Sequence, residues 1–365
     1  MKGAFKIIVV NGIILSSLLL IVELFFGAWI FSTNNLNNLG ILKDTELVYK
    51  HDLYKSPDGL IHYTRDKFGL RGASTFNQPS KIDILTVGGS TTDQRYTTDS
   101  LTWQECLEKK LKLHNKPYLV ANAGVDGQST YGHIKNFELW FPEVADLKPK
   151  YILFYVGIND FLRISDNNHY DNLGINDYTW PQRMMILIRN NSAIYNLVRK
   201  LKGALDAKAV KVSHDKIDFE TVKYTKQPTT HPHSELVNVY EQQVVPNFKK
   251  RIQTLINYSV QLKATPIFIT QPSIKYKFIN DTLHGVSETS LLIDKYPCNG
   301  VDYYQLLTLL NNGLKEVCKD NYPVIELTSL TSWDSTHFYD FYHYTPAGTK
   351  KVGDEIFKEL VGILP

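Results

Sequence analysis

The sequence predicts an α/β fold in which helices cover both faces of a parallel sheet. From residue 82 to the C-terminus, short apolar runs alternate with segments of helical periodicity, the pattern of repeated strand and helix units. The short runs are apolar throughout and rich in β-branched residues, as is typical of strands buried on both faces. A third observation adds a membrane helix, because residues 5–31 are apolar over more than the ~20 residues that span a bilayer core.

The expected strands are five runs, at residues 82–87, 118–121, 151–156, 265–270 and 323–327. The first helix is expected at 102–113, where Trp103, Leu107 and Leu111 share one face. Further helices are expected at 133–140, 236–263 and 303–317, followed by a terminal helix. This last helix has a defined start, because Thr345 is a good N-cap and Pro346 suits the first helical position.

The chain divides into three parts. Residues 1–31 form a cytoplasmic tip and a membrane anchor, residues 32–80 form an Asn-rich linker and an approach segment, and residues 81–365 form the main domain. Within that domain, residues 161–234 fit the rhythm of strands and helices poorly, because Asn- and Asp-rich loop mixes with a Lys- and Thr-rich stretch. We expect this interval to be an insertion beside the functional site.

The apolar N-terminal stretch favours an uncleaved signal anchor. Lys2 and Lys6 flank its start and the residues after it are uncharged, so the positive-inside rule keeps the N-terminus in the cytoplasm. The main domain then lies in the periplasm or outside the cell. A cleaved signal peptide is the alternative, but its apolar region would run only ~7–15 residues. A cleavage site after Ala28 would also place Phe26 where a small residue is needed. Glu23, near the outer end of the apolar stretch, is expected to reach the membrane surface.

Charge and cysteine content exclude two classes of protein. The formal net charge of +3 is too small for a nucleic-acid surface, and three cysteines are too few for a disulfide framework. Cys298 and Cys318 flank a predicted helix and could pair in an oxidising compartment, whereas Cys106 lies on the apolar face of an early helix. None of them has a histidine partner nearby in the sequence, so structural roles are favoured over a catalytic thiol.

The candidate chemistry lies in four short blocks, each at a strand end or just before a helix. They are Gly88-Gly89-Ser90-Thr91-Thr92, Asn122-Ala123-Gly124-Val125-Asp126-Gly127, Gly157-Ile158-Asn159-Asp160 and Asp340-Phe341-Tyr342-His343. Open parallel sheets bind ligands at the carboxyl ends of their strands. Ser90 is the candidate nucleophile, because a turn between strand and helix exposes its hydroxyl and directs its own N–H toward a developing oxyanion.

The second and third blocks supply candidate oxyanion donors. Gly127 offers a backbone N–H that can approach a ligand closely, since glycine has no Cβ, and Asn159 offers a side-chain amide. One donor of this kind is worth about 3–4 kcal/mol of transition-state stabilisation.

The fourth block supplies the candidate base. His343 can take the proton of Ser90, and Asp340 can orient its ring from the same loop. Asp334 and His337 have the same spacing, but they lack the adjacent helix start. We therefore favour Asp340 and His343.

In this order the four blocks resemble those of the SGNH hydrolases, also called GDSL esterases and lipases. The four letters correspond to Ser90, Gly127, Asn159 and His343, and the resemblance runs from about residue 82 to the C-terminus. The approach segment 68–72 is similar to that of membrane-anchored bacterial members. The resemblance implies a three-layer α/β/α sandwich, a Ser-His-Asp triad, an oxyanion hole that includes the N–H of Ser90, and no metal or cofactor. One departure is that Gly89 stands where the family commonly has aspartate.

This resemblance implies a serine esterase that acts on short acyl esters, above all O-acetyl esters of a cell-surface glycan, through an acyl-enzyme on Ser90. Thr91, Gln128, Asp160 and Arg95 are further candidates for contact with the substrate. The expected partners are an acylated glycan or another small ester, the membrane, and a membrane protein of glycan biosynthesis.

Three alternatives stay open at this point. An O-acetyltransferase would use the same triad, since only the acceptor differs. A lipase or lysophospholipase would profit from the nearby bilayer, although the insertion is polar and does not have the composition of an apolar lid. A glycan-assembly module without activity is the third, and the intact set of four blocks argues against it.

Overall fold

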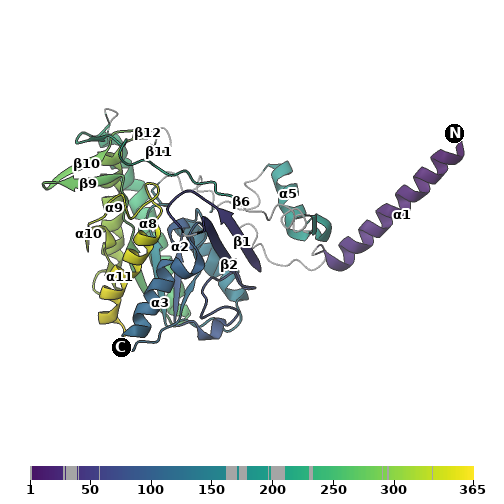
Figure 1. The fold of residues 1–365 in the computed structure, drawn as a ribbon, viewed down its shortest axis with the longest axis horizontal. Helices are drawn as coiled ribbons and strands as arrows, with labels where there is room; N and C mark the ends of the chain where they lie inside the picture. Colours follow the sequence, from purple (N-terminus) through teal and green to yellow (C-terminus); the bar gives the residue numbers. More distant parts are fainter. Residues whose placement is uncertain are drawn as a thin grey trace.

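A five-stranded parallel sheet lies at the centre of the main domain (Figure 1). Its order is β13-β8-β5-β3-β4, and the strands are β3 (Ile84–Gly88), β4 (Val120–Asn122), β5 (Tyr151–Val156), β8 (Thr265–Thr270) and β13 (Val324–Ile325). All neighbouring strands pair in parallel, and β3 lies between β4 and β5. The order of the strands therefore reverses at β3, which places a ligand-binding crevice at the carboxyl ends of β3 and β5.

This computed structural model describes residues 2–27, 29, 39, 41–56, 58–161, 171, 179–195, 197–198, 210–229, 233–289, 291–293, 296–330 and 332–365. The prediction of a strand near each of the five apolar runs is confirmed. Helices are present at each predicted place, as α3 (Trp103–Leu113), α4 (Thr130–Lys135), α7 (His233–Val239), α8 (Val245–Gln261), α9 (Gly300–Cys318) and α11 (Pro346–Ile363). The helix expected at 236–263 is divided into α7 and α8 by a π-helical turn, Tyr240–Val244, just before Pro246.

The helices cover both faces of the sheet, which confirms the predicted three-layer sandwich. Side chains alternate along β3, so Leu85 faces one layer and Ile84 the other. Leu85 belongs to the core that includes α8 and α9, whereas Ile84 belongs to the core that includes Trp103 of α3 and Ile356 of α11. Burial on both faces explains why the strands are apolar throughout.

A hairpin lies within residues 32–80, the interval predicted to hold the linker and the approach segment. β1 (Thr45–Lys50) and β2 (Leu60–Arg65) pair in an antiparallel ladder, and β6 (Val210–Lys211) adds to β1 in parallel. These strands enclose a small core made by Tyr49, Leu53, Ile61, Tyr63, Tyr96 and Tyr339. Since Tyr96 and Tyr339 come from the main domain, the hairpin packs against that domain.

The remaining elements are short and lie around this body. They are α2 (Ser90–Asp93), β7 (Tyr224–Thr225), β9 (Tyr276–Ile279), β10 (Thr282–Val286), β11 (Leu291–Ile293), β12 (Tyr296–Cys298) and α10 (Leu327–Leu330). β7, β10 and β9 form a second small antiparallel sheet, and β11 pairs with β12.

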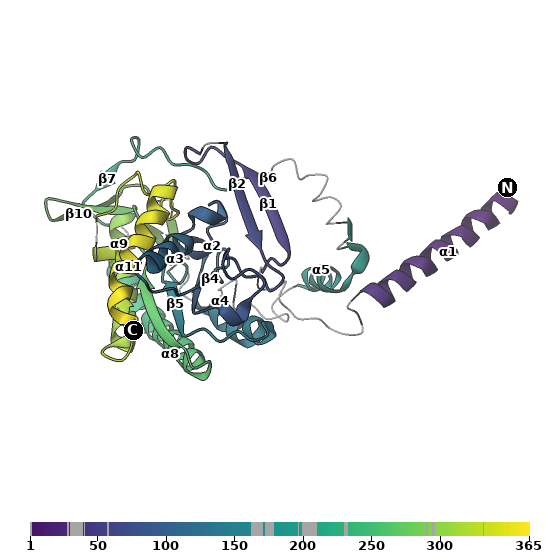
Figure 2. The same cartoon turned by 60° about the horizontal axis from the view of Figure 1, so that its bottom comes forward.

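The N-terminal helix α1 (Lys2–Phe26) projects away from this body, and α5 (Trp180–Asn191) lies beside its end (Figures 1 and 2). From Phe5 to Phe26 the helix is long and apolar enough to cross a membrane, properties that a signal sequence shares. Glu23, expected at the membrane surface, contacts protein groups: its carboxylate accepts hydrogen bonds from Ser192 Oγ at 2.6 Å and from the backbone N–H of Ala193 at 3.0 Å. The end of α1 is thereby joined to the predicted insertion.

The three cysteines are free thiols, so the pairing of Cys298 with Cys318 that the sequence left open is not formed. Both are buried, and burial raises the pKa of each thiol to about 12. They lie near opposite ends of α9, which has 19 residues and is therefore about 28 Å long. A disulfide allows a Cα separation of no more than ~7 Å, which excludes the pair on geometry.

Candidate active site

Ser90 lies at the carboxyl end of the central strand β3. Gly89 is the N-cap of α2, so the chain turns directly from strand into helix and leaves Ser90 partly exposed. Helix α3 fixes the backbone of this turn, because Trp103 Nε1 donates a 3.2 Å hydrogen bond to the carbonyl of Thr91 and Gln104 Nε2 donates one of 3.1 Å to the carbonyl of Thr92. The buried core of α3 thus sets the position of the candidate nucleophile.

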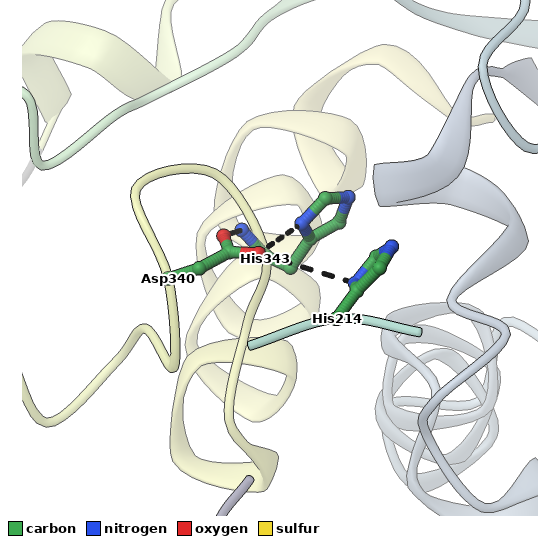
Figure 3. Close-up of side chains that lie close together, drawn as sticks. All are labelled: His214, Asp340 and His343. Carbon is green, nitrogen blue, oxygen red and sulfur yellow. Dashed lines mark hydrogen bonds and ion pairs between the residues drawn. The ribbon is translucent and has the colours of Figure 1, made fainter. Parts of the chain in front are cut away.

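A hydrogen-bonded chain joins Ser90, His343 and Asp340. The Nε2 atom of His343 is 2.8 Å from Ser90 Oγ, and its Nδ1 atom is 2.7 Å from Asp340 Oδ2. Figure 3 shows the carboxylate of Asp340 at the Nδ1 side of the ring. With Nδ1 protonated and bound to Asp340, the Nε2 lone pair faces the serine hydroxyl, as general-base catalysis requires.

The loop that carries this pair is held by its own backbone. The other oxygen of Asp340 accepts N–H groups of Tyr342 at 2.8 Å and His343 at 2.7 Å. Burial alone would raise the pKa of Asp340, but the hydrogen bonds from His343 and the backbone outweigh it and hold the pKa below its ordinary value. Thr345 caps α11 immediately afterwards through the N–H of Gly348, as its sequence position predicts. The carboxylate is therefore charged and fixed.

The second pair with the same spacing does not reach Ser90. His337 Nδ1 lies 2.9 Å from Asp334 Oδ1, so the two side chains do form a pair, but 62% of the Asp334 side chain is exposed. The backbone of His337 instead accepts the N–H of Thr345 and so supports the start of α11. Between the two alternatives, the structure brings only Asp340 and His343 to the nucleophile.

Asn159 lies against the nucleophile turn, and Gly127 directly precedes Gln128, the hydrogen-bond partner of Asn159. Asn159 Nδ2 donates a 2.8 Å hydrogen bond to the carbonyl of Gln128, which connects the loop after β5 to the loop after β4. Gly127 has a φ of 77°, a left-handed conformation that favours glycine. Ser90, Gly127 and Asn159, the residues predicted as oxyanion donors, thus follow three neighbouring strands, β3, β4 and β5.

Gly89 lies in close contact with Asn159 and with the loop after β4. A Cβ atom at this position would lie 2.3 Å from Asn159 Nδ2 and 2.8 Å from the carbonyl oxygen of Gln128. Both distances are far below van der Waals contact, so in this chain a side chain at position 89 would displace the Asn159 amide.

Two of the four residues proposed for substrate contact turn inward. Asp160 is 1% exposed and accepts hydrogen bonds from Thr130, and Gln128 exchanges hydrogen bonds of 2.8 and 3.1 Å with Asn136. Thr91 lies at the site, but its hydroxyl accepts a 2.6 Å hydrogen bond from Gln271. Asp160 and Gln128 support the loops of the site, and their burial does not fit direct contact with a substrate, whereas Thr91 lines the candidate pocket.

Arg95, the fourth residue, does face the candidate substrate pocket. Its side chain is 28% exposed, 3.5 Å from Asp126 and 3.6 Å from Asp93. The pocket is narrow and is lined by Ser90, Thr91, Gln94, Arg95, Tyr96, Thr97, Asp126, His214, Tyr339, His343 and Tyr344.

His214 and Tyr339 are pocket residues that the sequence did not indicate. His214 Nδ1 lies 2.9 Å from the hydroxyl of Tyr339, and the His214 ring centroid is 4.4 Å from that of His343 (Figure 3). No motif marks His214, since it lies in the predicted insertion, far from the other blocks. Ligand atoms of His214, Asp340 and His343 lie within 4.8 Å of one another, the one such group among the described residues that could hold a metal ion. The hydrogen bonds of His343 to Asp340 and Ser90 already account for both of its ring nitrogens.

Comparison with known proteins gives one family. A family model described as GDSL-like Lipase/Acylhydrolase matches residues 84–356, an interval that holds all four sequence blocks. No curated protein matches the chain.

Similar solved structures include the acetyl xylan esterase AlAXEase, the psychrotrophic esterase EstA from a Pseudoalteromonas species, and LAE5, an alpha/beta hydrolase enzyme from the metagenome of Lake Arreo in Spain. Their sequence identities to this chain are 13%, 11% and 13%. The matches cover 76%, 77% and 77% of this chain and 100%, 97% and 95% of theirs, each with a TM-score of 0.40.

Proposed function

This chain belongs to the family of GDSL-like lipases and acylhydrolases and is a hydrolase, and we propose that it is a membrane-anchored serine esterase that removes short acyl groups from a cell-surface glycan. The observation that carries the chemistry is the chain of 2.8 and 2.7 Å contacts from Ser90 through His343 to Asp340. Acetyl is the acyl group we propose, as the resemblance of the four sequence blocks implies.

The first half of the proposed reaction transfers the acyl group to Ser90. The Oγ atom of Ser90 attacks the ester carbonyl carbon while Nε2 of His343 takes its proton, and Asp340 stabilises the imidazolium that results. The N–H groups of Ser90 and Gly127 and the amide of Asn159 stabilise the oxyanion. The intermediate collapses, the C–O bond to the alcohol breaks, and His343 returns the proton to the departing alcohol oxygen.

The second half of the reaction releases the acyl group. Water occupies the place of the departed alcohol, and Nε2 of His343 takes a proton from it as its oxygen attacks the acyl carbon on Ser90. The carboxylic acid leaves, and the proton on His343 returns to Ser90 Oγ. A sugar hydroxyl in place of water would give transfer with the same residues.

Two observations support the proposals of a membrane anchor and a glycan substrate. Helix α1 has the length and apolarity of a membrane span, and Lys2 and Lys6 near its start favour a cytoplasmic N-terminus. The pocket beside Ser90 also carries Arg95 and Asp126, polar groups that suit a hydroxyl-rich molecule. A catalytic domain outside the cytoplasm and next to the membrane would meet cell-surface glycans.

The test uses the full chain in detergent, with p-nitrophenyl acetate, a long-chain p-nitrophenyl ester and an acetylated polysaccharide as substrates. We expect acetate release from the first and third, little turnover of the long-chain ester, and none by Ser90→Ala. A fluorophosphonate probe should label the wild type and not this variant. Addition of a free sugar separates hydrolysis from transfer, because an acetylated sugar appears only if transfer occurs. A clear preference for the long-chain ester would contradict the proposal in favour of a lipase.

A separate measurement tests the topology. A reporter fused after Pro365 should be active outside the cytoplasm, and the protein should stay with membranes after a high-salt wash. A reporter that is active in the cytoplasm would overturn the proposed orientation, and release of a shortened soluble chain would show that α1 is a cleaved signal.

A further inference from the structure

One wall of the pocket at Ser90 comes from a segment that no sequence block contains. His214 follows the two-residue strand β6, and contacts on both sides fix its place. Before it, Ser213 Oγ lies 2.7 Å from Tyr96 Oη, and after it the N–H of Ile217 donates a 2.9 Å hydrogen bond to the carbonyl of Tyr339. The segment is therefore tied to the nucleophile side and to the histidine loop at once.

The imidazole of His214 lies alongside that of His343. Their ring centroids are 4.4 Å apart, and Figure 3 shows both Nδ1 atoms on the side of Asp340 and both Nε2 atoms on the opposite side. Tyr339 engages Nδ1 of His214 at 2.9 Å. Within the described part of the chain, no hydrogen bond reaches its Nε2, although this residue lines the pocket with Ser90.

The position of this wall shows which half of an ester it would face. His343 Nε2 hands its proton to the departing alcohol oxygen, so a group beside Nε2 lies on the alcohol side of the ester. The oxyanion donors Gly127 and Asn159 are not among the residues that line this pocket, whereas His343 and His214 are. The Nε2 side of the His214 ring therefore faces the space that the alcohol part of the ester would occupy.

Polar side chains that line the pocket keep unused hydrogen-bonding capacity. Arg95 lies 3.6 Å from Asp93 and 3.5 Å from Asp126, longer than hydrogen bonds, and its Nε makes no hydrogen bond within the described residues. Burial lowers the pKa of His214, and the neighbouring His343 lowers it further. A neutral imidazole offers one donor and one acceptor, which matches the donor and acceptor capacity of a hydroxyl group.

We infer that His214, with Arg95 and Asp126, forms a subsite for a polyhydroxylated alcohol, in which His214 Nε2 hydrogen-bonds a hydroxyl next to the ester oxygen. The inference rests on the proposed esterase function and adds the class of its leaving group. The subsite is built on an insertion outside the sheet, so it gives specificity without altering the triad.

The experiment compares two acetyl esters in the full-length enzyme. Glyceryl monoacetate has a neighbouring hydroxyl on its alcohol, and ethyl acetate lacks one. We expect His214→Ala to lower kcat/KM about tenfold for glyceryl monoacetate, the value of one hydrogen bond to substrate, and less than about threefold for ethyl acetate. His214→Gln, which keeps a donor and an acceptor, should recover part of the loss. His62→Ala, at an exposed histidine of β2, is the matched control and should leave both substrates unaffected.

Two results would overturn the inference. An equal loss for both esters would mean that His214 acts through His343, and no loss for either would mean that it does not contact the alcohol. Labelling of Ser90 by a fluorophosphonate at the wild-type rate checks that the variant is folded. Failure of the esterase proposal looks different, because the wild type would then turn over neither ester, or Ser90→Ala would be as active as the wild type.

Discussion

Arg65 donates a 2.6 Å hydrogen bond to the carboxylate of Asp93, three residues after Ser90. Both side chains are almost completely buried. The same guanidinium also binds the carbonyl of Gly124 at 2.5 Å and that of Gly69 at 2.6 Å. Strand β2 of the N-terminal hairpin is thereby bound to the helix that Ser90 begins and to the loop after β4.

The first prediction follows from this buried pair. Arg65→Ala leaves the carboxylate of Asp93 buried without its shortest partner, and breaking such a pair costs about 3–5 kcal/mol. We expect the free energy of unfolding, measured by urea denaturation of the full chain in detergent, to fall by that amount. Lys150→Ala is the control, because Lys150 forms an exposed pair with Asp83 whose loss costs less than about 1 kcal/mol. Equal effects of the two substitutions would contradict the assigned role of Arg65.

The second prediction concerns Gly89. In Gly89→Ala the new methyl group meets the Asn159 amide, so this oxyanion donor must move, and we expect kcat on p-nitrophenyl acetate to fall by about 10²–10³. Gly362→Ala is the control, since a Cβ there meets nothing within 4 Å in helix α11. Wild-type kcat in Gly89→Ala would show that Asn159 either adapts or does not serve the oxyanion.

Much of this site was predictable because its parts are local in sequence. Each strand is an apolar run, and the polar residues that follow it reach the same sheet edge whatever the details of packing. The pair Asp340 and His343 could be favoured over Asp334 and His337 because the Thr-Pro helix start follows it directly.

The wall of the pocket could not be predicted in this way. His214 reaches His343 through the pairing of β6 with β1, and β6 has only two residues, too few to show a periodicity. The sequence did not predict the hairpin of β1 and β2 for a related reason, since its apolar residues pack on Tyr96 and Tyr339, which lie far away in the sequence. Contacts between distant segments decide both features.

The third prediction uses a buried histidine away from the pocket. His133 of α4 is 1% exposed, and its burial lowers its pKa from 6.5 to about 4, although Asp160 and Asp171 act in the opposite direction. Above pH 6.5 the ring is neutral in the folded and the unfolded chain. As the pH falls from 6.5 to 4, only the unfolded chain takes up the proton. The free energy of unfolding therefore falls by about 3 kcal/mol between these pH values.

His133→Gln should remove that part of the pH dependence. We expect the free energy of unfolding of the variant to change less between pH 6.5 and pH 4 than that of the wild type, whatever its absolute value. His62→Gln, at an exposed position, should follow the wild-type curve. Parallel curves for wild type and His133→Gln would show that this ring is protonated in the folded protein and refute the prediction.

The last prediction identifies the base. His343 is the histidine within 2.8 Å of Ser90 Oγ, so His343→Ala should lower kcat by about 10³–10⁶, the scale seen when a triad member is removed. Asp340→Asn should also be severe, because an amide would no longer hold the ring with its Nδ1 proton toward position 340 and its Nε2 lone pair toward Ser90. His337→Ala is the matched control, since His337 belongs to the other pair of the same spacing and should keep activity within about threefold of wild type if it lies outside the triad. Thermal unfolding checks that each variant is folded. Loss of activity in His337→Ala, with His343→Ala active and folded, would move the base to the other pair and disprove the assignment.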